Sequence, residues 1–263
     1  MDCFIDERDL KILEKDSCTF FVLGRILGFK CDRIITDHEK LLICHSCQPY
    51  PVWIWTADDI SLDELEKAYR LTEENGFLDG KHTINLKYEA AEFFIKRAEN
   101  DGKKLSITTN MLAYECPEPI EPHVRADGEL HRCTEDDVDT LAEFMDMFHK
   151  ETDLDKLSRD EYRIKAEEGI RHGALFLWKN SNGKYVSSCS YRPNSEYISV
   201  GLVLTLPEFR RKHYAENLVY EVTCIAKDFG SMPMLYTDAD YKASNECYKR
   251  IGYKLKGKLC TIG

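Results

Sequence analysis

Residues 200–253 read VGLVLTLPEFRRKHYAENLVYEVTCIAKDFGSMPMLYTDADYKASNECYKRIGY, and this stretch decides the fold class. Val200 to Leu204 predicts an apolar strand. Ala215 to Phe229 places its apolar residues at the three- and four-residue spacing of a helix that buries one face. The elements expected after it are a strand near Leu235, a short helix from Ala243 to Arg250 and a strand from Tyr253. This alternation of strands and helices favours an α/β domain with parallel pairing.

A basic turn, Arg210-Arg211-Lys212-His213, joins the first strand to the long helix. The first amides of a helix have no intrahelical acceptor and carry the positive end of its dipole. A pyrophosphate placed there gains hydrogen bonds and charge neutralisation together. The turn therefore indicates an anion site, with a solvated surface turn as the alternative reading of the cluster alone.

Two motifs in this stretch resemble the GNAT acyltransferase superfamily. The run Arg210 to Ala215 matches the family's acyl-CoA loop, Arg/Gln-x-x-Gly-x-Gly/Ala, and Tyr248 to Tyr253 matches its later Tyr-x-x-x-Gly-Phe/Tyr element. The resemblance extends from about Gly128 to the C-terminus. It departs from the family at His213, where glycine is usual, and at Tyr241, where many relatives have asparagine.

The resemblance implies transfer of an acyl group, most often acetyl, from a coenzyme A thioester to an amine. We therefore expect acetyl-CoA as the cosubstrate and a primary amine of a small acceptor as the substrate. The resemblance also implies that amides of the preceding strand polarise the thioester carbonyl, as in an oxyanion site. The cofactor-binding residues implied in this way are Val203, Leu204, Thr205, Arg210, Arg211, Lys212, His213, Tyr214, Ala215, Asn245 and Tyr248.

Tyr248 matches the family tyrosine that protonates the departing thiolate. A phenol with a pKa near ~10 can donate a proton to a thiolate when a hydrogen bond is already in place. Without the resemblance, Tyr248 would be interpreted as an aromatic residue on the inner face of a short helix.

The general base is not identified by the sequence. Relatives often carry a glutamate on the strand that spans Tyr197 to Thr205 here, and this strand has none. Glu151, His149, Glu196 and a water chain remain the candidates. Residues 135–161 contain eleven Asp or Glu and three Lys or Arg, which favours a cationic acceptor and places Glu151 first as its contact. A solvated acidic helix face is the other interpretation of such a charge run.

A second functional class stays open because His213 and Tyr241 are both off-pattern. The chain would then bind acyl-CoA with little or no turnover, as a sensor or interaction module. An enzyme and a sensor differ in whether any amine causes release of the free thiol.

Composition limits the partners and the compartment. The net charge of −11 and the pI near 5.3 argue against nucleic acid, because phosphate binding needs a basic surface. No segment has the order of a signal peptide or the length of a membrane span. Eleven cysteines without an export signal favour free thiols in the cytoplasm, and a homodimer is the default assembly.

One cysteine pair suggests a metal or redox site. Cys44-His45-Ser46-Cys47 is a lone CxxC with His38 nearby, but zinc sites usually combine two such pairs. We therefore expect neither a metal site nor a redox site at this pair.

The chain is expected to form two α/β domains with mixed sheets, the smaller one first. Residues 1–116 form the first, the proline-rich residues 117–122 a linker, and residues 123–263 the GNAT-like domain. In the first domain, Ser61 with Glu64 and Asn75-Gly76 mark the two ends of a helix. No basic acyl-CoA loop precedes residue 120, so this domain is interpreted as a degenerate GNAT-like copy or, alternatively, as a plain α+β accessory domain.

Residues 123–205 are expected to give a strand, two helices and an antiparallel meander, with turns at Ser181 to Lys184 and at Pro193-Asn194-Ser195. This is the layout of a GNAT domain before its cofactor loop. Only eleven residues follow Gly252, whereas the family usually places two strands there. One strand is therefore missing or supplied by the first domain.

Overall fold

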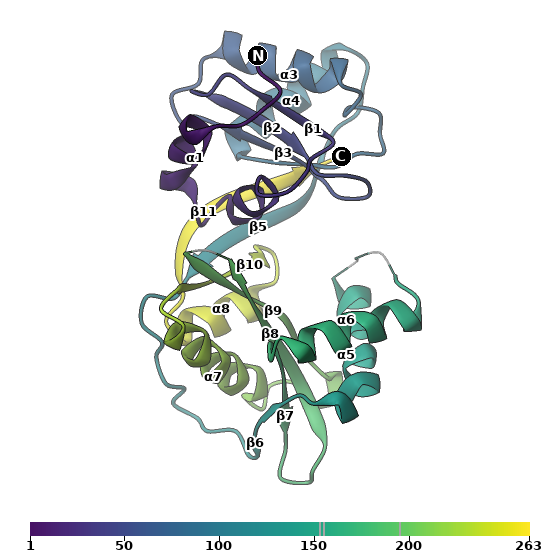
Figure 1. Ribbon diagram of the computed structural model, residues 1–263, viewed down its shortest axis with the longest axis vertical. Helices are drawn as coiled ribbons and strands as arrows, with labels where there is room; N and C mark the ends of the chain where they lie inside the picture. The colour runs from purple at the N-terminus through teal and green to yellow at the C-terminus, as the bar shows by residue number, and fades with distance from the viewer. Residues whose placement is uncertain (153, 155, 195) are drawn as a thin grey trace. The chain divides into compact units, whose positions relative to one another are not determined.

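The computed structural model describes residues 1–152, 154, 156–194 and 196–263. Its contacts divide the chain into two compact units. The first unit comprises Met1–Tyr114, Tyr236–Tyr241 and Leu255–Gly263, and the second comprises Glu115–Leu235 and Lys242–Lys254. Each unit is a mixed α/β structure (Figure 1), which confirms the predicted fold class.

The first unit contains four α-helices, one short 3-10 helix and six strands. Its helices are α1 (Glu7–Leu13), η1 (Glu14–Asp16), α2 (Phe21–Ile26), α3 (Leu62–Glu74) and α4 (Tyr88–Asn100). Its strands are β1 (Arg33–Thr36), β2 (Leu41–His45), β3 (Val52–Thr56), β4 (Ile84–Leu86), β5 (Ile107–Glu115, whose last residue belongs to the second unit) and the greater part of β11 (Lys254–Ile262).

The sheet of the first unit runs in the order β1-β2-β3-β4-β11-β5. β1, β2 and β3 are antiparallel neighbours, β3 and β4 are parallel, and β11 is antiparallel to β4. Alternate side chains of its strands fill two cores. Ile43 and Ile54 pack with α3 and α4, whereas Leu42, Trp53 and Trp55 pack with α1 and α2. Helices therefore cover both faces of this sheet.

The second unit contains the predicted GNAT-like elements. Its helices are η2 (Glu135–Asp137), α5 (Val138–Glu151), α6 (Arg159–Arg171), η3 (Pro207–Phe209), α7 (Tyr214–Asp228) and α8 (Lys242–Arg250). Its strands are β6 (Glu129–Arg132), β7 (Leu175–Lys179), β8 (Tyr185–Asn194), β9 (Tyr197–Thr205) and β10 (Met232–Asp238), of which the last three residues belong to the first unit.

The strands of the second unit follow the order β10-β9-β8-β7-β6. β6 to β9 are antiparallel neighbours, and β10 is parallel to β9. Apolar residues of α5 and α6 form one core with Leu175, Leu177 and Leu204. α7 packs on β7, β8 and β9, and Figure 1 shows it on the other side of these strands from α5 and α6.

One predicted turn is partly wrong. Pro193 and Asn194 continue β8, opposite Ile198 and Tyr197 of β9, and Ser195 lies outside the described residues. Proline is tolerated there because β7 begins only at Leu175, opposite Ser190, so the missing amide of Pro193 faces no ladder partner on that side.

The strand expected from Tyr253 is β11, and its residues from Leu255 onward pack in the first unit, where Cys260 lies opposite Leu86. The compact units are therefore discontinuous in sequence. The predicted boundaries at residues 116 and 123 divide the chain into segments that are each continuous in sequence. That these segments are domains stays a prediction.

Candidate active site

The predicted acyl-CoA loop connects β9 to α7. After η3 the chain turns through two residues with left-handed backbone, Arg211 at φ +62° and His213 at φ +64°. His213 is the N-cap of α7, and no side chain caps this end of the helix among the described residues. A turn of this kind directs successive backbone amides to one side and forms an anion-binding concavity. His213 thus adopts the backbone conformation that explains why the family uses glycine there.

Short-range contacts fix the loop. Pro207 begins η3, and the guanidinium of Arg210 donates from Nε to the carbonyl oxygen of Thr205 at 3.1 Å. The ammonium of Lys212 lies 5.2 Å from the ring centre of Phe209, which itself packs against Tyr214. The exposed charges of Arg211 and Lys212 therefore stand on an ordered turn.

The imidazole of His213 is held by a buried carboxylate. Nδ1 of His213 lies 3.0 Å from Oε2 of Glu216, one turn into α7, and Arg250 donates to both Glu216 oxygens at 3.0 and 3.2 Å. Burial opposes ionisation of Glu216, but the hydrogen bonds from Arg250 and His213 outweigh it and lower its pKa. This cluster joins the end of α8 to the first turn of α7.

Arg210 and Glu151, both predicted site residues, form an ion pair. Glu151 is the last residue of α5, and its Oε1 accepts from Nη2 of Arg210. Both side chains are a little over a third exposed. A diphosphate bound to Arg210 would compete with Glu151 for the same guanidinium.

β10 pairs with only the beginning of β9. They pair only from Tyr197 to Ser199 in the described register, although β9 continues to Thr205. The pairing of β8 with β9 shifts between Ser188 and Ser190, and Leu202 has φ +51°, which together mark a β-bulge. The predicted carbonyl-polarising residues Val203, Leu204 and Thr205 directly follow this bulge.

Two buried serines of β8 hold the bulge in place. The hydroxyl of Ser188 donates to the carbonyl oxygen of Leu202 at 2.8 Å, and that of Ser187 donates to the carbonyl oxygen of Leu204 at 2.7 Å. The two hydroxyls thus supply hydrogen bonds to carbonyl oxygens that backbone amides would bind in a regular ladder.

Tyr214 and Ala215 are the first two residues of α7, and the hydroxyl of Tyr214 makes a hydrogen bond. Its hydroxyl donates to Asp127 Oδ1, while Ser181 donates to Oδ2 of the same residue at 2.6 Å. Hydrogen bonds from Ser181 and Tyr214 lower the pKa of Asp127 to about 2. Tyr214 is therefore a buried residue that holds the end of the loop through Asp127, and its side chain is not exposed to a ligand.

Tyr248 and Asn245 lie one turn apart on α8 and are both buried. The ring of Tyr248 packs edge-on against Tyr253 at 5.9 Å, and the hydroxyl of Tyr253 lies 2.8 Å from Thr223 Oγ1 on α7. The structure thus connects the helix that carries Tyr248 to the helix that begins at the basic loop.

Sequence reasoning missed the supporting residues of the site: Glu216, Arg250, Asp127, Ser187 and Ser188. The three-residue spacing of His213 and Glu216 is a signal that could have indicated their contact. No sequence signal indicates the partners that come from other strands and helices, because their contacts are made only after folding.

The acidic region of residues 135–161 is partly neutralised. His131 and Thr134 donate to Asp137, and Arg159 and Arg163 pair with Asp139. Asp153 and Asp155 lie outside the described residues. The charge excess of this region is therefore smaller than its composition indicates.

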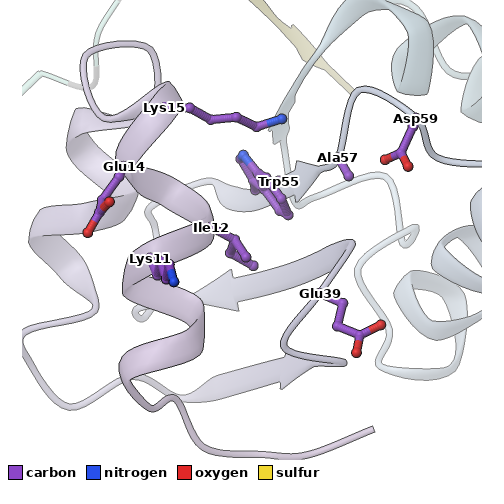
Figure 2. Close-up of a pocket in the computed structure, with 8 residues that line it drawn as sticks. All are labelled: Lys11, Ile12, Glu14, Lys15, Glu39, Trp55, Ala57 and Asp59. Carbon is purple, nitrogen blue, oxygen red and sulfur yellow. The ribbon is translucent and has the colours of Figure 1, made fainter.

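Two further features lie in the first unit. Asp6, Asp9 and His38 bring ligand atoms within 4.8 Å of one another, but both ring nitrogens of His38 already contact carboxylates. A surface hollow of about 450 Å³ is lined by residues of mixed charge around Trp55 (Figure 2). Neither feature contains a predicted site residue.

Comparisons with known proteins agree with this geometry. Residues 139–253 match the model of the acetyltransferase (GNAT) family. No curated protein sequence matches the chain significantly. Among solved structures, a GNAT-family acetyltransferase from Colwellia psychrerythraea has a TM-score of 0.61 at 11% identity, over 99% of this chain and 97% of that one.

Two further structures show the same fold. A GCN5-related N-acetyltransferase from Kribbella flavida has a TM-score of 0.62 at 14% identity, over 95% of this chain and 94% of that one. Another, from Sphaerobacter thermophilus, has a TM-score of 0.64 at 13% identity, over 81% and 71%. The family match covers the residues that build the basic loop, the bulged strand and α8. Residues 139–253 therefore match the acetyltransferase (GNAT) family, and the match supports an acyltransferase.

Proposed function

We propose that the second unit transfers an acetyl group from acetyl-CoA to a primary amine of a small, cationic acceptor. The observation that carries this proposal is the left-handed turn at Arg211 and His213, which opens onto the uncapped first turn of α7 within the described chain. Backbone amides at such a turn bind a diphosphate, and four cationic or imidazole side chains surround it.

In this proposal the bulged part of β9 binds the pantetheine arm and the thioester carbonyl. Amides of Val203 to Thr205 that have no partner in β10 supply the hydrogen bonds. A neutral amine attacks the carbonyl carbon, the C–S bond breaks, and Tyr248 donates its proton to the departing thiolate sulfur. Coenzyme A supplies the thioester, whose thiolate is a good leaving group.

The acceptor is placed near the end of α5. Glu151 is the predicted contact for its positive charge, and the binding of coenzyme to Arg210 would release that carboxylate from its ion pair. Because other carboxylates of residues 135–161 are already paired, Glu151 is the main carboxylate that would balance the positive charge of the acceptor.

The test is a free-thiol assay with acetyl-CoA over a panel of small amines. We expect thiol release with a cationic amine, and we expect Tyr248→Phe to slow it by about a hundredfold with little change in coenzyme affinity. Tyr220→Phe, on α7, is the matched control. A chain that binds acetyl-CoA but releases no thiol with any amine would be the sensor considered above.

We propose further that the first unit is a degenerate GNAT-like copy. Two helices, three antiparallel strands, a helix, a parallel strand and a helix follow one another in both units. One strand follows each series, β5 after the first and β11 after the second, and both strands lie mainly in the first unit. The bridge between Asp2 and Thr36 corresponds to the pairing of β6 with β7.

In this copy the anion site is lost. The counterpart of the basic loop is the short segment 57–61, which carries Asp58 and Asp59. Ser61 and Glu64 form a capping box that occupies the first amides of α3. We therefore propose one coenzyme site per chain. The eleven free thiols support a cytoplasmic protein, and the homodimer stays a prediction.

A further inference from the structure

Two cysteines of the first unit lie in direct contact. The sulfur of Cys44 donates to the sulfur of Cys31 across 3.5 Å, and the two residues are thirteen positions apart. Cys31 precedes β1, and Cys44 lies within β2, opposite Ile34. Both belong to the core between the sheet and the α1–α2 side.

The two sulfurs differ in access. Cys44 is completely buried, whereas Cys31 is partly exposed and its thiol contacts the carbonyl oxygens of Ile26 and Phe29 at 3.4 and 3.6 Å. Burial, together with the neighbouring Cys31, raises the pKa of the Cys44 thiol. A small oxidant in solution therefore reaches the sulfur of Cys31 first. The buried sulfur of Cys44 can react only with a sulfur that lies in the core beside it, as that of Cys31 does.

We propose that Cys31 and Cys44 form a reversible dithiol–disulfide site that reacts with low-molecular-weight disulfides such as glutathione disulfide. The Cys31 thiolate attacks one sulfur of glutathione disulfide, which forms a mixed disulfide and releases one glutathione thiolate. The Cys44 thiolate then attacks the Cys31 sulfur, which forms the intramolecular disulfide and releases the second glutathione thiolate. The two protons lost by the cysteines go to the two glutathione thiolates, and glutathione disulfide is the two-electron oxidant.

The closure needs only a local movement. A disulfide has an S–S length of about 2.05 Å, so the two sulfurs must approach by roughly 1.5 Å. Cys31 lies in the irregular segment between α2 and β1 and can move without breaking the β1–β2 ladder. Cys44 is fixed by the buried strand on which it lies.

This pair does not follow the CxxC spacing of the sequence, for which no metal or redox use is expected. Cys47, the second cysteine of that motif, is exposed, whereas Cys44 is buried in the core. The structure therefore pairs Cys44 with Cys31 rather than with Cys47.

The test uses the full chain, equilibrated in buffers with increasing ratios of glutathione disulfide to glutathione. After free thiols are blocked by alkylation, a non-reducing digest is analysed by mass spectrometry. We expect a cross-linked peptide pair that contains Cys31 and Cys44, increases with the ratio and disappears after treatment with dithiothreitol. Cys47→Ser is the matched control and should leave this cross-link unchanged.

Cys31→Ser should abolish the cross-link, and Cys44 of the folded variant should stay protected from alkylation. The proposal is overturned if Cys44 pairs with Cys47, or if Cys31 accumulates only as its glutathione adduct. It is also overturned if neither cysteine is oxidised while other thiols of the chain are. The three contradicting outcomes are measured on the native sequence, so poor folding of a variant does not affect them, and they are independent of transferase activity.

Discussion

At residue 213 the chain places an imidazole in a backbone conformation that usually belongs to glycine. The left-handed region costs a non-glycine residue about 1–2 kcal/mol, and the contact with Glu216 partly offsets this cost. The same contact ties the imidazole to a residue in the first turn of α7. The side chain and the backbone conformation at this position are therefore compatible.

Substitution at position 213 tests this interpretation. We expect His213→Val to be less stable than His213→Gly by about 2 kcal/mol, because a β-branched residue at positive φ is strained whereas glycine is not. Urea unfolding of both variants measures the difference. Equal stability of the two variants would show that the left-handed turn is absent in solution.

Glu151 has a different predicted effect. An amide at this position cannot balance a cationic acceptor, so Glu151→Gln should lower kcat/KM for the amine by about tenfold, a loss of about 1.4 kcal/mol. Coenzyme affinity should be unchanged or higher, because Arg210 loses its competing partner.

Steady-state kinetics with both substrates, and Glu143→Gln on the exposed side of α5 as the control, measure this effect. A loss of coenzyme affinity with an unchanged kcat/KM for the amine would contradict the assignment of Glu151 to the acceptor.

The sequence predicts the residues of the loop but not their partners. Arg210 to Ala215 were identified because they match a contiguous motif. Glu216 and Ser188 were not, because the first acts through a side chain from α8 and the second through a bulge in the neighbouring strand. Contacts of this kind depend on register, which a single sequence does not reveal.

At the scale of elements, the N-terminal segment is fixed by a histidine between two carboxylates. Nδ1 of His38 lies 2.7 Å from Asp9, which is fully buried, and Nε2 lies 2.9 Å from Asp2. Burial alone would lower the pKa of His38, but its hydrogen bonds with Asp9 and Asp2 outweigh burial and raise it. Asp6, at 3.7 Å, adds a third carboxylate, and Arg8 opposes the positive charge.

This arrangement predicts a pH dependence of stability. Because the pKa of His38 is higher in the folded chain, its contribution to stability is complete below its ordinary pKa of 6.5. The contribution is lost as the pH rises through the folded pKa. The free energy of unfolding of the native chain should therefore fall toward that of His38→Gln as the pH rises. A difference between the two proteins that stays constant or grows with pH would contradict this account.

Element boundaries were predicted well where caps are local. Ser61 with Glu64 forms the expected capping box, and Gly76 has the positive φ that ends α3. Ser158 with Glu161 forms a second capping box of the same kind. The same logic would have identified α1, where Asp6 and Asp9 form a capping box before a short helix. β1 is only four residues long and was missed for that reason.

At the scale of the whole chain, the fold class could be predicted because strands and helices alternate in both halves. The course of the last strand could not. β11 pairs with β4, and Cys260 lies opposite Leu86 although the two are far apart in sequence. Hydrophobic pattern predicts that such a strand exists, but not which neighbour it joins.

The two units make one prediction together. From the first pair of helices to the helix after the parallel strand, both have the same order of elements. Only the second has a basic turn before its long helix, so the chain should bind one coenzyme molecule. Isothermal titration of the full chain with coenzyme A measures this number directly. We expect one site per chain, an affinity that falls with added salt, and loss of binding in Arg211→Glu/Lys212→Glu, whereas Asp58→Asn/Asp59→Asn leaves binding unchanged. Absence of binding, two sites per chain, or full affinity in the charge-reversed variant would contradict the account.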